Sequence, residues 1–185
     1  MVFKLLPLLR RSAQPRVLSI LNGTLEKPIQ EDDLGLEKNW GIAAVVNHTT
    51  VCTSLAFDYL DQQDEEHKIV YLHATPGFVS TRTPRKTRPS MNSGVFWWAF
   101  ISTIQGISGW IIYYFGMNVT ESGQRHSYHL TSDNFRPGSW QINRHSSVVP
   151  PNGVLRGYQE KGLAEKVWDH SLRTWDTALA SGVSL

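Results

Sequence analysis

Short apolar runs recur along the chain, and three of them predict strands. Residues 16–21 and 68–73 are rich in aliphatic and β-branched side chains, and turn-forming Pro, Asn or Gly residues lie close to their ends. Both are the length of a buried strand. Residues 126–131 predict a third strand.

Longer stretches between these runs have the spacing of helices. Residues 2–12 predict a short helix, and residues 40–60, apolar on most faces, predict a helix buried on more than one side. Residues 163–179 place apolar side chains on one face and charged ones on the other, which predicts a final amphipathic helix. Residues 24–39 and 133–157 predict irregular loops. The alternation of helices and strands indicates an α/β fold with a parallel sheet.

Residues 94–116 carry no charged side chain and contain many aromatic ones. A helix of this length would span about 34 Å, enough to cross a bilayer. Polar residues interrupt it, however, and Gly106 and Gly109 favour a break between two shorter helices. We therefore favour an apolar helical lid over an apolar small-molecule substrate. A membrane span and contact with a membrane surface remain as alternatives.

Composition excludes several classes of protein. The chain has 185 residues, 41% of them hydrophobic, and a net charge of +2, which argues against disorder and against nucleic-acid binding. Cys52 is the one cysteine, so an intrachain disulfide and a cysteine-based zinc site are excluded. His126 and His129 would point to opposite faces of a strand. We therefore expect no metal site.

The basic start of the chain contains only a five-residue apolar run, too short for a secretory signal. A mitochondrial presequence would also be basic and free of acids, but a helix leading into a strand is the favoured interpretation. We therefore expect a single domain over residues 1–185 in the cytoplasm.

Residues 74–81, Ala-Thr-Pro-Gly-Phe-Val-Ser-Thr, follow a predicted strand directly. This segment resembles the P-G-x-V-x-T signature of the short-chain dehydrogenases/reductases. The resemblance implies a Rossmann-type sheet with NAD or NADP bound at the carboxyl ends of its strands. The cofactor-binding residues that it implies are Pro76, Gly77, Val79 and Thr81.

The resemblance extends over nearly all of the chain but covers only the second half of a usual family member. It implies an incomplete Rossmann-type parallel sheet, strands 5–7 with flanking helices, and the apolar lid at residues 94–116. The likeness is to a fungal branch found in secondary-metabolite gene clusters. The glycine-rich G-x-x-x-G-x-G turn that holds the cofactor pyrophosphate does not occur in this sequence.

The catalytic residues of the family are also missing. No Tyr is followed four positions later by Lys. By position, Trp40 stands in place of the Tyr, Ala44 in place of the Lys, and Ile20 near the place of the Ser. Trp has no ionisable hydroxyl and cannot protonate a carbonyl.

These observations leave three functional hypotheses. The first is an NAD(P)-dependent oxidoreductase acting on a carbonyl or alcohol of an apolar metabolite, completed by an amino-terminal half. The second is a catalytically inactive relative that binds a metabolite or a partner, or a decayed product. The third is a membrane-associated helper anchored by residues 94–116. In each case, a partner chain could be needed to cover the exposed edge of the sheet.

Overall fold

The computed structural model describes residues 2–77, 79, 96–97, 99–100, 102–104, 106–107, 110 and 116–182. The chain divides into two compact units, one formed by residues 1–75 with 129–185 and the other by residues 76–128. The prediction of a single domain stays a prediction.

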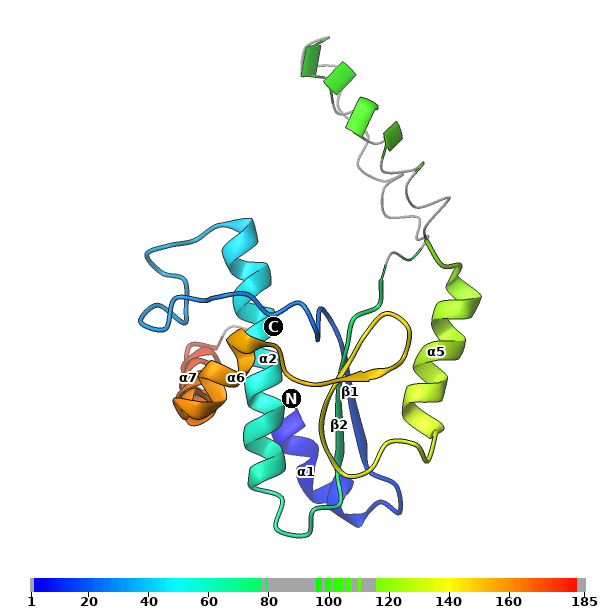
Figure 1. The fold of residues 1–185 in the computed structure, drawn as a ribbon. Helices are drawn as coiled ribbons and strands as arrows, with labels where there is room; N and C mark the ends of the chain where they lie inside the picture. Colours follow the sequence, from blue (N-terminus) through cyan, green and yellow to red (C-terminus); the bar gives the residue numbers. More distant parts are fainter. Residues whose placement is uncertain are drawn as a thin grey trace. The chain divides into compact units, whose positions relative to one another are not determined.

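The first unit is an open α/β sheet with helices packed against it (Figure 1). Strands β1, β2 and β3 are parallel, and β4 pairs antiparallel to β3, in the order β1-β2-β3-β4. The α/β class and the parallel sheet are thereby confirmed. The elements are α1 (Val2–Arg11), β1 (Arg16–Ile20), α2 (Ile42–Gln62), β2 (Val70–Ala74), β3 (Gly138–Ile142), β4 (Val148–Val149), α6 (Gly153–Glu160) and α7 (Leu163–Ala180).

The central strand β2 is buried on both faces, as its apolar run predicts. Tyr71 packs with Phe57 of α2 on one face, whereas Leu72 packs with Phe135 and Ile142 on the other. Helices α2, α6 and α7 lie together on one side of the strands (Figure 1) and bury a separate apolar cluster. Its members are Val51, Leu55, Leu155, Tyr158, Leu163, Ala164 and Val167.

The predicted strand at residues 126–131 is wrong, because these residues belong to helix α5 (Val119–Thr131). The Asn118 side chain accepts a hydrogen bond from the Glu121 backbone N–H at 2.7 Å, which caps the start of the helix. Glu121 and Arg125 then form an i,i+4 ion pair at 2.8 Å. His126 and His129 are three apart on a helix and share a face, contrary to the prediction.

The prediction that residues 133–157 are irregular is also wrong. This stretch contains β3, β4 and the start of α6. The side chain of Asn143 accepts from the backbone N–H groups of His145 and Ser147 at 2.8 and 3.1 Å, forming the turn between the two strands. The side chain of Asn152 caps α6. The Pro residues of this stretch lie between the elements, Gly138 and Gly153 begin β3 and α6, and Gly157 lies inside α6.

The predicted lid at residues 94–116 lies largely outside the described residues. The residues described between 96 and 110 have helical backbone conformation. Within the part of the chain that the structure describes, none of the helices combines the length and apolarity needed to span a bilayer.

Candidate functional site

The carboxyl ends of β1 and β2 lie side by side, the edge at which open α/β sheets bind ligands. Pairing continues past the strands: the Leu21 N–H donates to the carbonyl oxygen of Ala74 at 3.0 Å, and the Thr75 N–H donates to that of Ile142 at 2.8 Å. The hydroxyl oxygens of Thr24 and Thr75 are 3.3 Å apart and half-buried. This edge therefore presents two adjacent hydroxyl groups.

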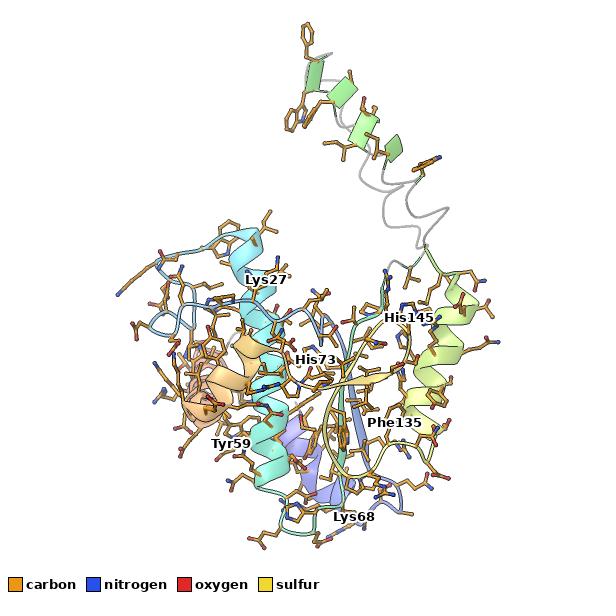
Figure 2. All side chains as sticks on the ribbon, in the orientation of Figure 1. Lys27, Tyr59, Lys68, His73, Phe135 and His145 are labelled. Carbon is orange, nitrogen blue, oxygen red and sulfur yellow. The ribbon has the colours of Figure 1, made fainter. Side chains whose placement is uncertain are left out.

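A buried polar network lies next to this edge. His73 lies on β2 (Figure 2). Its Nδ1 is 2.7 Å from Oγ of Ser54 on α2. The Ser54 hydroxyl also donates to Oε1 of Glu26 at 2.8 Å. All three residues are buried. Through these hydrogen bonds, the loop after β1 is connected to α2 and to β2.

Two amide side chains complete the network around the Glu26 carboxylate. The Asn152 amide donates to the carboxylate oxygen Oε2 at 3.2 Å and to the Glu26 carbonyl oxygen at 3.1 Å. With the Gln141 amide oriented so that its nitrogen faces the cluster, it donates to Oε1 at 3.0 Å and to the carbonyl oxygen of Gly23. Glu26 therefore receives donors from α2, β3 and the start of α6.

Burial disfavours the charged forms of Glu26 and His73, the two ends of the network. Burial raises the pKa of Glu26, and the nearby Asp58 carboxylate raises it further, whereas the hydrogen bond from Ser54 lowers it. Burial also lowers the pKa of His73 to about 4, so the imidazole is neutral at pH 7.

We assign the His73 proton to Nδ1, which then donates to Ser54 while Ser54 donates to Glu26. This assignment leaves Nε2 of His73 as a buried acceptor with no hydrogen-bond partner among the described residues. The hydrogen bonds therefore run from His73 through Ser54 to the Glu26 carboxylate, which accepts the last of them.

Gly23 lies directly against His73. A Cβ atom at Gly23 would overlap the carbonyl group of His73 and would lie 2.9 Å from its Cγ. The turn after β1 can approach β2 this closely only because the residue has no side chain.

The three positions that stand in for the family's catalytic residues fall at the same end of the sheet unit. Ile20 is the last residue of β1 and is 45% exposed. Trp40 precedes α2 and is 74% exposed, and Ala44 is half-buried in the first turn of α2. The assignment of these positions by resemblance stays a prediction.

The residues predicted to bind a cofactor belong to the second unit. Gly77 has φ 71°, in the left-handed region that favours glycine, so this position needs its glycine. Val79 forms a parallel bridge with Met117. Thr81 lies outside the described residues. The role of these residues stays a prediction.

Sequence reasoning missed the buried network. Ser54 and His73 are polar residues inside apolar elements, which was a usable signal because buried polar groups need partners. Glu26 lies in a polar loop and gave no such signal.

The structure describes no group of three or more His, Cys, Asp or Glu side chains that could hold a metal ion.

The fold is that of an open α/β protein, and comparisons with known proteins add relatives. The chain is similar to oxidoreductase lepF of Aspergillus flavus, 28% identical over 219 residues covering 96% of this chain and 59% of that protein. Oxidoreductase andH of Emericella variicolor is 26% identical, covering 96% and 57%. The NmrA-like family domain-containing oxidoreductase notO of an Aspergillus species is 33% identical over 112 residues, covering 56% and 34%.

No protein-family model matches the chain. The chain spans less than two thirds of the length of these curated relatives. It is therefore related to fungal proteins named as oxidoreductases, and it corresponds to a part of their length.

Proposed function

We propose that this chain forms the carboxyl-terminal part of an NAD(P)-dependent oxidoreductase of the short-chain dehydrogenase/reductase type. Its substrate would be a carbonyl or alcohol on an apolar metabolite of fungal secondary metabolism. One observation carries the proposal: the sequence Pro76-Gly77, with Gly77 in the left-handed region, lies just after the carboxyl end of a central parallel strand. The names of the relatives support it.

The residues at this edge suit a nucleotide cofactor. The adjacent hydroxyl groups of Thr24 and Thr75 can donate to and accept from a phosphate or a carboxamide. In the second unit, the left-handed Gly77 would by itself permit close approach of a ligand to the backbone. When bound, the cofactor would supply or accept the hydride, while the protein orients the substrate carbonyl.

The buried network would give this edge a fixed geometry. Glu26 anchors the loop that carries Thr24, and His73 lies two residues before Thr75 on the neighbouring strand. Groups held in this way are organised before the ligand arrives, which lowers the entropy cost of binding.

A second function is favoured by the residues at the family's catalytic positions. Trp40 and Ala44 cannot supply the proton that reduction of a carbonyl requires. A relative that binds a nucleotide or a metabolite without transferring hydride would retain the sheet edge and lose these side chains.

Hydride transfer separates the two functions. The protein purified from the cells that make it would be incubated with 4-deuterated NADH or NADPH and a panel of apolar aldehydes and ketones. We expect deuterium in the alcohol product, detected by mass spectrometry. Cofactor binding without deuterium transfer would support the second function, and the absence of both would contradict the two proposals.

A further inference from the structure

The first unit contains a hollow of about 310 Å³ between α2 and the β3–β4 hairpin. It is lined by Asp58 of α2, by residues 139–141 of β3 and by residues 148–151, which include β4. A volume of this size lies at the lower end of the range for small-molecule sites. The hollow is separate from the hydroxyl pair of Thr24 and Thr75, so a ligand here is independent of the proposed redox chemistry.

The half-buried carboxylate of Asp58 has only neutral hydrogen-bond donors around it. The Gln159 side chain donates from Nε2 to Oδ2 of Asp58 at 2.7 Å. Burial raises the pKa of Asp58, whereas the hydrogen bond from Gln159 and the nearby Ser139 hydroxyl lower it. Among the described residues, no basic side chain forms an ion pair with Asp58. When this carboxylate is ionised, its charge is therefore not balanced by a cation of the described chain.

The charged groups that interact with Asp58 are also acidic. Burial raises the pKa of both Glu26 and Asp61, and the negative charge of Asp58 raises each of them further. His67 acts on Asp61 in the opposite direction, and Arg156 is exposed and does not line the hollow. The electrostatic potential of these carboxylates therefore favours a cationic ligand in the hollow.

The other walls of the hollow are apolar and rigid. Residues 148–151 are Val-Val-Pro-Pro, and the two proline rings fix the backbone angle φ at their positions. Trp140 also lines the hollow, and its Nε1 donates to the carbonyl oxygen of Arg136 at 2.8 Å, which holds the indole in place. A Trp ring attracts organic cations as well as apolar groups. The walls therefore suit a cation that carries an apolar group.

We propose that this hollow binds a small organic amine, whose ammonium group pairs with the Asp58 carboxylate. The apolar part of the amine packs against Trp140 and the Val-Val-Pro-Pro segment. Charge-assisted hydrogen bonds of this kind are stronger than those between neutral groups, and partial burial strengthens them further. A metal ion fits less well, because the described residues contain no group of three or more His, Cys, Asp or Glu side chains that could hold one.

A ligand-observed ¹⁹F NMR titration tests the proposal on the protein purified from its natural cells. The probes are 4-fluorobenzylamine, which is protonated at pH 7, and 4-fluorobenzyl alcohol, which is similar in size but neutral. We expect the amine to bind with a Kd below about 1 mM and about tenfold or more tightly than the alcohol, because only the ammonium group pairs with a carboxylate. An amine that does not bind, or that binds no better than the alcohol, would overturn the proposal.

Two variants of the natural protein locate the amine in the hollow. Asp58→Asn keeps the size of the side chain and its acceptor for Gln159 but removes the charge, and it should weaken amine binding by about tenfold or more. Asp61→Asn removes a charge from the same helix outside the hollow and should change amine binding by less than about threefold. Urea unfolding confirms that both variants fold. Equal losses of binding would exclude direct pairing with Asp58.

Trp140 offers a second, independent variant. Trp140→Leu should weaken binding of the amine by about 3- to 10-fold and binding of the alcohol by less, because only the cation is attracted to the ring. Trp175→Leu, on α7 and outside the lining of this hollow, is the control and should leave both affinities unchanged. If Trp140→Leu weakens neither probe, the hollow is not where the amine binds.

A free amine and the Lys side chain of another protein would present the same ammonium group. Competition against the bound ¹⁹F probe distinguishes these two sources. One competitor is butylamine, and the other is Nα-acetyl-lysine methylamide, which carries the same alkylammonium group between two peptide groups. We expect butylamine to displace the probe at the lower concentration. Displacement at a lower concentration by the lysine derivative would assign the hollow to a protein side chain and contradict a small-molecule site.

Discussion

The hydroxyl oxygen of Ser54 lies 2.7 Å from Nδ1 of His73 and joins the imidazole to the Glu26 carboxylate. One small side chain on α2 therefore links the central strand to the loop that follows β1. Since the imidazole is buried, its Nδ1 depends on Ser54 for a hydrogen-bond partner, whereas Glu26 also accepts from two amide side chains.

Replacing Ser54 by Ala should destabilise the protein by about 1–3 kcal/mol, because Nδ1 of His73 loses its partner and Glu26 loses one of its donors. The measurement is the free energy of unfolding in urea at pH 7. The control is Ser181→Ala, at an exposed hydroxyl beyond the end of α7, which should change stability by less than about 0.5 kcal/mol. Equal effects of the two variants would show that the network does not stabilise the fold.

Gly23→Ala should also be destabilising, because the added Cβ overlaps the backbone carbonyl of His73. We expect a loss of about 1–3 kcal/mol as the turn moves away from β2. Gly157→Ala provides the opposite control, since it lies inside α6 with nothing within 4 Å of a Cβ, and it should stabilise by about 0.5–1 kcal/mol. A Gly23→Ala variant as stable as the parent protein would contradict the close approach.

His73 makes stability depend on pH. Its folded-state pKa, about 4, lies below the ordinary value of 6.5, so the folded protein binds fewer protons than the unfolded chain between these values. Stability from His73 is therefore present above pH 6.5 and is lost as the pH falls, by up to about 1.4 kcal/mol per pH unit. The raised pKa of Glu26 acts in the opposite direction, because protonation of Glu26 relieves the cost of its burial.

The variant His73→Asn isolates this contribution, because the Asn amide can still donate to Ser54 but does not titrate. We expect its stability to fall less than that of the parent between pH 6.5 and 5, measured by urea unfolding at each pH. His145→Asn, at an exposed position of the β3–β4 turn, should retain the parent's pH dependence. If His73→Asn retains it as well, His73 is not the group that titrates.

The sequence predicted those elements whose pattern is local. Residues 16–21 and 68–73 correspond to β1 and β2 because short aliphatic runs between turn residues have few alternatives. Helix α2 (Ile42–Gln62) matched the long apolar stretch. In residues 126–131 the polar composition hid a helix that begins at the Asn118 cap.

The site was harder to predict than the fold. Ser54 lies 19 positions from His73 and 28 from Glu26, so no local motif relates them. Their proximity follows from the parallel pairing of β1 with β2 and from the packing of α2, which only the tertiary structure establishes.

The positions assigned by family resemblance can be tested by restoring the missing groups. Trp40→Tyr combined with Ala44→Lys should raise the carbonyl reductase activity of the cofactor-binding protein by about 10²- to 10⁴-fold, the contribution of a positioned general acid. The control is Trp40→Phe with Ala44→Met, which places side chains of similar size to Tyr and Lys at both positions but supplies no proton donor. A double variant that binds cofactor and is no more active than the parent would show that the start of α2 is wrongly aligned.

The most direct test of the account is a fluorescence titration of NADH and NADPH, made on the protein purified from its natural cells and on the 185-residue chain. We predict that the natural protein, weighed by intact mass spectrometry, binds one of the two at least tenfold more tightly. The 185 residues alone should bind with a Kd above about 1 mM, because they lack the glycine-rich turn that holds the pyrophosphate. A natural protein that binds neither nucleotide at 1 mM would contradict the proposed function. Micromolar binding by the 185 residues would contradict the claim that tight cofactor binding needs a glycine-rich turn outside this sequence.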